Sequence, residues 1–471
     1  MRPDSKKHLY LPIAVIAAYL IFTLILYEAG PFKWVTYHPL RFWSFQILYI
    51  AALLYGWMIG TRASVPDHQW EDWDNKRVAN IITPHITINF VYELINAHRR
   101  FSITSFDLKK LIKSILSGAS SMGSAYSAFQ SGVDQTSSGA LGGTAVTLFN
   151  LCWAFLAFNV LILGFIHFRN LSKYSKIVQI LTTGLIIGEY LGTGTNIGVF
   201  RVILIFVILY LIRVIRKNRA SLSAGSRTKK RNNTYKVFIF AAGAAVFVLV
   251  LFSRIMQSRG GILLWQSNTY NVGGIYLNKN SVFFKILPSG LYILLIALSG
   301  YLCQGYYGMS LCMRVPWEPG LGIGHSMALM KLFDRFSSIS HDSSYQFRIA
   351  ELFGWEEGVR WHSMYSWIAN DLTFWGVIPI MFFIGMLYAM AYKDAVVTNN
   401  PYAKVVTYYF TLLSIFIPCN NQLFQSTYTY FAFVFALILW LGTRGRKQFR
   451  IVLGRRNYWR KVAKTEQNTA C

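Results

Sequence analysis

The sequence predicts an all-α polytopic membrane protein with about ten to twelve transmembrane helices, on three observations. Hydrophobic residues make up 54% of the 471 residues, which is above the usual apolar share of a soluble domain. Apolar runs of about 20 residues, the length that a bilayer core requires, recur along the chain. Lys and Arg gather in short segments between these runs and in the C-terminal tail, as charges that orient membrane helices do. With that distribution, the formal charge of +27 does not indicate a nucleic-acid partner.

The apolar runs give the predicted transmembrane segments in chain order. The first, at 9–28, follows a basic N-terminus but lacks a small-residue cleavage site, so we interpret it as a retained helix. The other predicted segments are residues 40–60, 144–167, 176–193, 197–212, 236–253, 371–392, 404–419 and 426–443. A weaker candidate at 78–97 carries His85, Asn89 and Glu93, which are costly against lipid and tolerable only against protein or water.

The basic clusters predict the orientation of the chain. Residues 213–236 and 444–464 are both rich in Lys and Arg, so we expect these segments and the N-terminal tail to be cytoplasmic. Two cytoplasmic ends require an even number of crossings. Including the segment at 78–97 gives about ten crossings and leaves 288–312 on the outer side. The cost of this topology is a basic outer loop at 98–113.

These segments divide the chain into four parts. Residues 1–253 are expected to form N-terminal transmembrane helices, and residues 254–370 a large external, periplasmic loop. Residues 371–443 are expected to form C-terminal transmembrane helices, and residues 444–471 a basic cytoplasmic tail.

Two irregular stretches lie outside the simple apolar runs. The run at 288–312 is apolar but interrupted by Ser, Gly and Gln, which predicts a re-entrant or broken pair of helices over the site. If it crosses once, a second short crossing near 321–333 restores the even number and gives about twelve spans. The Ser- and Gly-rich interval 114–143 predicts an external loop preceded by a short amphipathic helix.

The sequence GTGTNIGVFR at 192–201 places a glycine-rich turn before a predicted helix, with Arg201 about one turn into it. Backbone N–H groups and the helix dipole at such a turn favour an anion, whereas the alternative is an arginine that reaches toward lipid headgroups. Arg254 and Arg259 flank another predicted outer helix end, where positive charge is disfavoured. The negative group that holds them there is either a lipid phosphate or a diphosphate substrate.

The external loop supplies the candidate catalytic residues. We rank His325 and His362 highest as a general base, because each lies beside a predicted entry into the membrane, and take Glu351 as the alternative. We expect His341, in the polar middle of the loop, to be solvated. The candidate substrate-binding residues of the chain are Arg201, Arg254, Arg259, Arg314, Arg348 and Arg360. Arg348 and Glu351 are also placed to form a simple ion pair on one helix face.

Several kinds of chemistry lack their motifs in this sequence. It has no HExxH, and we expect no metal site. A P-loop and a GxSxG elbow are also missing, and we expect no cofactor. The five cysteines have no CxxC spacing and do not indicate a disulfide framework or a zinc site. The tryptophans of the external loop suit either sugar rings or a membrane interface.

The segment TGTNIGVFR resembles the "Thr-Gly-x-Arg before a helix" element of Wzy-type oligosaccharide repeat-unit polymerases, which build bacterial O-antigen and capsule. The long external loop and the following TFWGVIPIMFFIGMLYAMAY are also similar to that family, although Asp371 is shifted from the family's pattern. The resemblance implies a GT-C-like glycosyltransferase in the bacterial inner membrane, acting on undecaprenyl-diphosphate-linked glycans on the outer face. It also implies membrane lipids as partners, with a chain-length regulator protein as a further candidate.

Two rival functions remain open at this stage. An O-antigen ligase would use the same lipid diphosphate donor but transfer the glycan to the lipid A core. A lipid-linked oligosaccharide flippase would move the donor across the membrane without bond chemistry. The external interval is long for a loop without a function of its own, which favours an enzyme over a transporter.

Overall fold

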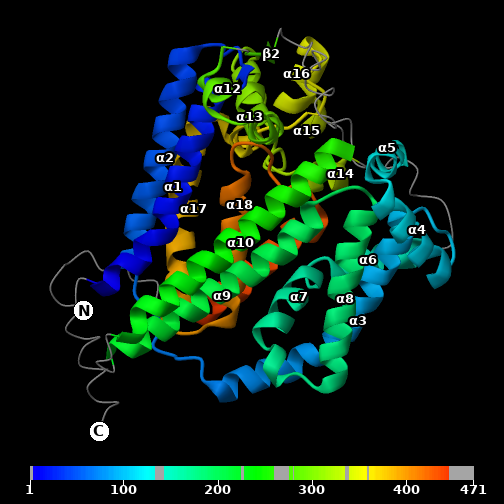
Figure 1. The fold of residues 1–471 in the computed structure, drawn as a ribbon, viewed down its shortest axis with the longest axis vertical. Helices are drawn as coiled ribbons and strands as arrows, with labels where there is room; N and C mark the ends of the chain where they lie inside the picture. The colour runs from blue at the N-terminus through cyan, green and yellow to red at the C-terminus, as the bar shows by residue number, and fades with distance from the viewer. Residues whose placement is uncertain are drawn as a thin grey trace.

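The structure is a computed structural model that describes residues 4–132, 143–223, 228–258, 275–278, 280–334, 339–357 and 360–444. In these ranges the chain is helical apart from loops and one short antiparallel pair of strands, β1 (Phe32–Lys33) and β2 (Tyr276–Leu277). Long helices run side by side, and short helices collect mainly at the ends of these helices (Figure 1). The prediction of an all-α membrane protein is confirmed by this architecture and by the helices described next.

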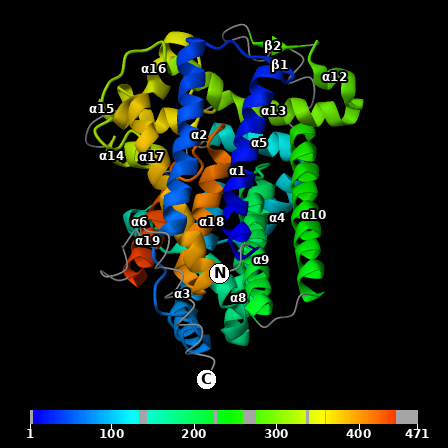
Figure 2. The same cartoon turned by 90° about the vertical axis from the view of Figure 1, so that its left-hand side faces the viewer.

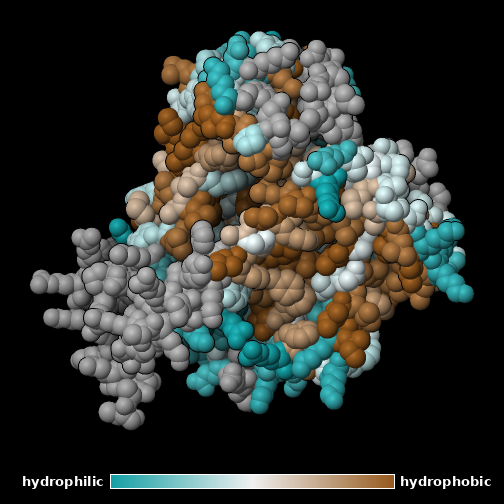
Figure 3. Space-filling view, in the orientation of Figure 1, coloured by the Kyte–Doolittle hydropathy of each residue, from teal (hydrophilic) through white to brown (hydrophobic). Residues whose placement is uncertain are grey.

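Within the part of the chain that the structure describes, five helices are long and apolar enough to cross a membrane. They are α1 (Asp4–Ala29), α2 (Pro39–Arg62), α9 (Ile197–Ser223), α17 (Met364–Val397) and α19 (Thr427–Arg444). Large apolar side chains such as Ile47, Tyr55 and Val246 are exposed on the outside of the bundle, which suits a lipid environment. Figure 3 shows apolar side chains over the middle of one face, with hydrophilic residues at its lower edge and top.

The predicted span at 144–167 is bent rather than straight. It consists of α6 (Thr144–Trp153) and α7 (Ala157–Ile166), which meet at an angle of 45° and together give a possible sixth span. Asn159 donates side-chain hydrogen bonds to the carbonyl oxygens of Phe155 at 2.9 Å and Ala432 at 2.7 Å. A side chain that enters the backbone hydrogen-bond ladder is a usual cause of a kink, and Phe155 lies at this bend.

Four further helices run along the bundle but do not meet the same test of length and apolarity. They are α3 (Asp72–Arg100), α8 (Lys173–Gly192), α10 (Thr228–Ser258) and α18 (Pro401–Phe416). Helix α3 contains the weak candidate at 78–97, and its Asn89 and Glu93 are only 1% and 5% exposed. These polar groups therefore face protein, as their cost in lipid requires. The total of ten to twelve crossings stays a prediction.

Contacts at one end of the bundle link the start of α1 to the C-terminal parts of α9, α17 and α19. They are Tyr392 Oη to His8 O at 3.1 Å, Arg216 Nη1 to Val396 O at 3.2 Å, and the Arg444–Asp394 ion pair. We call this the basic end. The predicted topology requires the N-terminal tail, the basic segment after α9 and the C-terminal tail to share one side of the membrane. The described ends of α1, α9 and α19, which lead into these segments, lie together at the basic end, whereas the tail after Arg444 lies outside the described residues. The assignment of this end to the cytoplasm stays a prediction.

Helices α2 and α17 pack closely because glycines face each other along their contact. A Cβ at Gly56 would lie 1.9 Å from Phe382 O, and one at Gly60 would lie 2.3 Å from Met386 O. From the other side, a Cβ at Gly385 would lie 2.1 Å from Leu53 O. Small residues that let backbones touch are typical of membrane helix pairs.

The region predicted as re-entrant differs from expectation. Residues 289–312 form one continuous helix, α13 (Ser289–Cys312), which lies across the end of the bundle in Figure 2. The predicted short crossing near 321–333 is also wrong, because α14 (Met327–Phe333) has only 7 residues. The residues that interrupt the apolar run serve packing instead: Ser299 is fully buried, and a Cβ at Gly305 would lie 2.3 Å from Pro418 O.

The interval 114–143 is partly helical where the structure describes it. The predicted amphipathic helix is α4 (Leu108–Ser120), whose first turn is capped by Asp107 accepting from Lys110 N at 2.9 Å. It is followed by α5 (Met122–Gly132), where we expected a loop. The remaining short elements are η2 (Phe168–Asn170), α12 (Val282–Ile286), α15 (Ile339–Asp342) and α16 (Tyr345–Phe353).

Helix α17 starts earlier than predicted, at Met364, and is interrupted at Thr373. Thr373 has φ 60° and ψ 172°, a conformation that a β-branched residue rarely adopts. The carbonyl oxygens of Ala369 and Asn370 lie just before the break, and both accept a hydrogen bond from Trp317 Nε1 at 3.0 Å. The break thus brings Asp371 and its neighbours into contact with the segment that follows α13.

Candidate functional site

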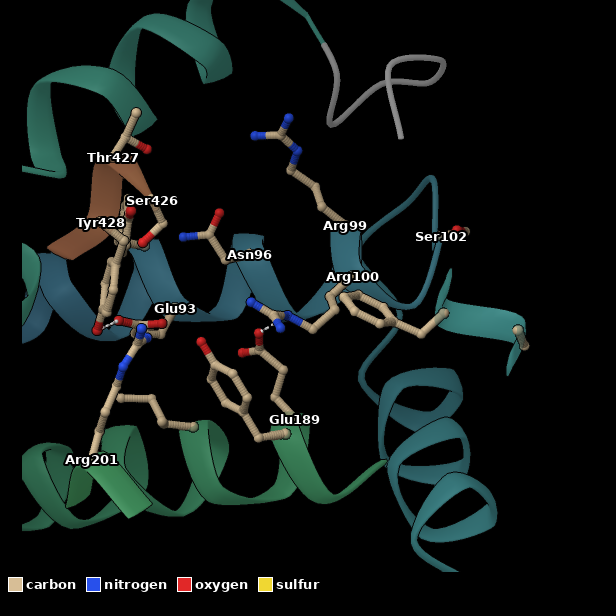
Figure 4. Close-up of a pocket in the computed structure, with 15 residues that line it drawn as sticks. Glu93, Asn96, Arg99, Arg100, Ser102, Glu189, Arg201, Ser426, Thr427 and Tyr428 are labelled. Atoms are coloured by element: carbon tan, nitrogen blue, oxygen red, sulfur yellow. Dashed lines mark hydrogen bonds and ion pairs between the residues drawn. The ribbon is translucent and has the colours of Figure 1, made fainter. Parts of the chain in front are cut away.

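The polar cavity is a space of about 410 Å³ between α3, α8, α9 and the start of α19. Figure 4 shows side chains from these helices pointing into it. Its charged and phenolic lining residues are Tyr92, Glu93, Arg99, Arg100, Glu189, Tyr190, Arg201 and Tyr428. This cavity is a candidate functional site, because ionisable side chains among membrane helices cost free energy and usually mark sites that bind or transport a ligand.

Arg100 is the one arginine of the polar cavity whose charge is balanced by a carboxylate of the described chain. It forms an ion pair with Glu189, which is only 2% exposed. The guanidinium of Arg100 also lies 4.4 Å from the ring centroid of Tyr190. Ion pairing and ring contact together hold Arg100 in place at the cavity wall.

Glu93 lies on the same helix as Arg100, and in Figure 4 it is on the side of this pair that faces Tyr428 and Arg201. Its carboxylate accepts a hydrogen bond of 2.8 Å from Tyr428 Oη. Among the described residues, no Lys or Arg lies within ion-pair distance of it. Glu93 is therefore held by a neutral donor and retains acceptor capacity toward the cavity.

Arg201, predicted from the glycine-rich turn, lines the polar cavity from α9 and points toward Glu93 and Tyr428 (Figure 4). It is only 6% exposed, and its Nη2 has long contacts to Gln422 Oε1 at 3.4 Å and Gln422 O at 3.5 Å. Its Nε has no hydrogen-bond partner in the described part of the chain. A nearly buried guanidinium with such weak partners favours an anionic ligand.

The turn before α9 has the expected form. Gly194 adopts φ 64°, and a Cβ there would lie 2.1 Å from Met122 O, so only glycine fits. This close approach packs the turn against α5 and fixes the start of α9, and with it the direction of Arg201.

The apolar pocket, with a volume of about 320 Å³, lies next to the polar cavity. It is lined mainly by hydrophobic side chains of α9, α10, α13 and α18, such as Phe200, Phe252, Leu298 and Phe416. Gln422 also lines this pocket, and the same side chain contacts Arg201 of the polar cavity. A polar space with arginines and an apolar space therefore meet at one glutamine.

His325 forms the second part of the candidate site. Its Nδ1 lies 2.9 Å from Asp371 Oδ2, and its Nε2 lies 3.0 Å from Tyr430 Oη. When the carboxylate of Asp371 accepts from Nδ1–H, Nε2 carries the free lone pair and accepts from the tyrosine hydroxyl. An imidazole oriented in this way by a carboxylate has the geometry of a general base.

The glycine-rich turn LGIG, residues 321–324, surrounds the carboxylate of Asp371. The backbone N–H groups of Gly322 and Gly324 donate to Asp371 Oδ1 at 3.0 Å and 2.9 Å, and His325 N donates to Oδ2 at 2.9 Å. A Cβ at Gly320 would lie 2.6 Å from Asp371 Oδ1. A Cβ at Gly324 would lie 3.0 Å from the same oxygen, so the turn closes on the carboxylate because Gly320 and Gly324 have no side chains.

The connection between α18 and α19, residues 417–426, contacts both parts of the site. Its Asn421 Nδ2 donates to His325 O at 3.3 Å, and its Phe424 O accepts from Ser326 Oγ at 2.7 Å. Its Gln422 accepts from Arg201. One short segment therefore ties the His325–Asp371 pair to the arginine of the polar cavity.

The other predicted basic residues are not gathered around the polar cavity. Arg348 binds Glu318 and the carbonyl oxygen of Pro316, so its suggested ion pair with Glu351 is wrong. Arg254 is exposed on α10, and Arg259 lies outside the described residues. Arg360 stacks on Trp355 with 5.5 Å between the guanidinium carbon and the ring centroid. Arg314 lines a different cavity, described below.

The remaining predicted catalytic residues differ in their surroundings. Glu351 is exposed on α16, whereas His362 is 1% exposed and neither of its ring nitrogens has a partner in the described chain. Burial lowers the pKa of His362 to about 4. His341, which we expected to be solvated, has a side chain that is 28% exposed, and its Nε2 also lies 3.1 Å from Glu357 Oε2, which raises its pKa.

Sequence reasoning missed several residues of the site. Arg99 and Arg100 belong to the basic segment 98–113, whose place on the outer side we counted only as a cost of the topology. Both line the polar cavity, so the departure from the positive-inside pattern was the signal that could have found them. Glu189 and Tyr428 carried no such signal.

Comparison of the chain with known protein families, curated proteins and solved structures finds no match. Within the described residues, no group of three or more His, Cys, Asp or Glu side chains is arranged to hold a metal ion. The functional argument therefore rests on the geometry of the polar cavity, the apolar pocket and the His325–Asp371 pair.

Proposed function

We propose that the protein is a membrane glycosyltransferase that joins oligosaccharide repeat units carried on undecaprenyl diphosphate into a longer polysaccharide. The observation that carries this proposal is the meeting of the polar cavity and the apolar pocket at Gln422. A lipid diphosphate needs cationic donors for its head and apolar surface for its chain, and these two spaces supply both.

In this proposal the diphosphate of the donor lies against Arg201 and Arg99, neither of which has a carboxylate partner among the described residues. As the glycosidic bond forms, the bond between the anomeric carbon and the diphosphate oxygen breaks, and negative charge grows on the leaving group. Fixed guanidinium groups stabilise that charge in a low-dielectric cavity.

His325 is proposed to accept the proton of the acceptor hydroxyl. Its Nε2 takes the proton as the sugar oxygen bonds to the anomeric carbon, and Asp371 stabilises the resulting imidazolium. The donor already carries an activated sugar, so the reaction needs no nucleotide. The GT-C-like architecture, the bacterial inner membrane and a periplasmic site belong to this proposal, as does a chain-length regulator as partner.

The transporter alternative gains one observation from the structure. Charges such as Glu93, Arg100 and Glu189 lie inside the helix bundle, as they do in many carriers of polar substrates. The His325–Asp371 pair favours the enzyme, because moving a glycan requires no oriented base. A ligase would use the same residues, and only the acceptor separates it from a polymerase.

The test is reconstitution of the purified full chain with undecaprenyl-diphosphate-linked repeat units. A polymerase lengthens the glycan on the lipid carrier, which gel separation of the products detects. A ligase transfers a glycan only when lipid A core is added, and a flippase changes the accessible leaflet without changing glycan length. Either of these last two outcomes would refute the proposal.

A further inference from the structure

The arginine cavity, with a volume of about 360 Å³, is formed by the start of α2, the segment after α13 and the break in α17. Arg41 and Arg314 line it together with Trp317, Thr373 and Trp375. No Asp or Glu is among its described lining residues. The cavity shares no lining residue with the polar cavity or the apolar pocket.

The two guanidinium groups of the arginine cavity are held by aromatic rings. The guanidinium carbon of Arg314 lies 4.4 Å from the Tyr37 ring centroid and 4.5 Å from that of Phe353. That of Arg41 lies 5.8 Å from the Phe45 centroid. Ring contacts cover the flat faces of a guanidinium and leave the N–H groups at its edges available. Within the described chain, neither group forms an ion pair.

Trp317 is fixed in orientation at the same cavity. Its Nε1 donates to the carbonyl oxygens of Ala369 and Asn370 at 3.0 Å, and 40% of the residue remains exposed. Tryptophans at a membrane interface direct their N–H groups toward headgroups and water. In this protein the N–H of Trp317 points into the protein. The exposed part of the indole therefore has no free hydrogen-bond donor, and such a surface suits the apolar face of a sugar ring.

We propose that the arginine cavity binds an acidic sugar of a glycan, with its carboxylate on Arg41 and Arg314 and its ring against Trp317. The proposal rests on the proposed function only in naming the glycan, which would be the repeat unit or the growing chain. It implies that the repeat unit contains a uronic acid or a similar carboxylated sugar. The site would hold the chain away from the diphosphate in the polar cavity.

The experiment measures binding of an oligogalacturonate of three residues to the full-length protein in nanodiscs of zwitterionic lipid. Its carboxyl-reduced counterpart serves as the neutral probe and inorganic pyrophosphate as the phosphate probe. We expect the acidic trisaccharide to bind, and Arg41→Gln and Arg314→Gln each to weaken it about 10-fold or more, because each removes a charge-assisted contact. Lys285→Gln is the control: this residue is exposed and lies outside the cavity, so its substitution should leave binding unchanged.

Three results would overturn the proposal. The first is no binding of the acidic trisaccharide, and the second is equal binding of the neutral probe. The third is complete displacement of the trisaccharide by pyrophosphate in both the wild type and Arg201→Lys, because pyrophosphate would then bind in the arginine cavity itself rather than in the polar cavity. Nanodiscs containing phosphatidylglycerol provide the lipid arm. If that lipid raises the melting temperature of the wild type but not of Arg314→Gln, while the trisaccharide fails to bind, the cavity is a lipid headgroup site. None of these readouts requires transferase activity, so they are separate from failure of the proposed function.

Discussion

The two ends of the helix bundle treat buried arginine in different ways. At the basic end, Arg444 is 1% exposed and is bound by Asp394 and by the carbonyl oxygen of Ser64, while Trp440 donates to the same Asp394 at 2.9 Å. In the polar cavity, Arg201 is 6% exposed, and among the described residues its guanidinium has hydrogen-bond contacts with the side-chain and backbone oxygens of Gln422, at 3.4 Å and 3.5 Å. The Nε of each arginine lacks a hydrogen-bond partner in the described chain, so the difference lies in charge. Arg444 is neutralised by a buried carboxylate, which indicates a structural role, whereas Arg201 has no carboxylate partner among the described residues, which indicates an anionic ligand.

This contrast separates residues whose loss affects folding from residues whose loss affects chemistry. Substitutions at the basic end should reduce the amount of folded protein in the membrane. Substitutions around the polar cavity and His325 should leave that amount near normal and reduce transfer per folded molecule. The following predictions run from the largest expected effect to the smallest.

The largest effect is expected for His325→Ala, which removes the proposed base. Polymer formation, normalised to membrane-inserted protein, should fall about 100- to 10,000-fold. His362→Ala is the comparison, because that histidine is buried and should mainly change protein abundance. If both variants keep near-normal normalised activity, neither histidine is the base, and the role passes to Glu351 or to the substrate itself.

Asp394→Ala should give the largest loss of stability, about 3–5 kcal/mol, because it leaves the buried Arg444 without its carboxylate. Thermal unfolding of the detergent-solubilised protein, followed by its fluorescent size-exclusion profile, measures this loss. Asp394→Leu combined with Arg444→Met, which removes both charges, should recover much of it. Wild-type stability of Asp394→Ala would show that the basic end is not held by this pair.

Arg201→Lys should lower normalised transfer about 100-fold while the protein inserts normally, because an ammonium cannot fork onto two phosphate oxygens. Arg213→Lys on the same helix is the matched control, since that side chain is exposed toward the basic end. Wild-type polymer from Arg201→Lys would remove the polar cavity from the mechanism and weaken the contrast with Arg444.

The smallest effects concern pH and two histidines near α16. The pKa of His362 is lowered to about 4 in the folded protein. Between this value and the ordinary value of about 6.5, the unfolded chain binds more protons than the folded chain, so the free energy of unfolding should rise as the pH rises from about 4 to about 6.5. The pKa of His341 is raised by Glu357, so its contribution is complete below about pH 6.5 and is lost as the pH rises through its folded value.

Unfolding of the wild type across this pH range should therefore show greatest stability near neutrality. Glu357→Gln should reduce the fall in the free energy of unfolding on the alkaline side by at most about 1 kcal/mol, because His341 is partly solvated. An unchanged alkaline slope in this variant would mean that the His341–Glu357 contact contributes nothing to folding.

The membrane character of the chain could be predicted because apolarity is a local property of sequence. Arg201 was also accessible, since its glycine-rich turn and helix lie within about ten residues of sequence. The His325–Asp371 pair was not, because the partners are 46 residues apart in the sequence. Each residue was noticed separately, and the contact between them depends on tertiary structure.

The error at 288–312 has a clear physical origin. Gln304 and Gly305 interrupt the apolar run and suggested a broken element in the membrane. In the structure they mark contacts instead: Gln304 Oε1 accepts from Trp361 N at 3.2 Å, and Gly305 touches the backbone after α18. A sequence pattern cannot distinguish a residue that ends a helix from one that admits a neighbour.

The glycine contacts between α2 and α17 have a consequence for how the molecule can move. Two helices whose backbones touch at Gly56, Gly60 and Gly385 cannot slide past each other without steric collision. The rigid unit is therefore α2, which begins near Arg41, and the part of α17 that follows the break at Thr373, whereas Asp371 precedes that break. Neither α2 nor α17 contributes to the described lining of the apolar pocket, so we expect that room for the lipid-linked substrate of the proposed function comes from movement of helices outside this pair, such as α9 and α10.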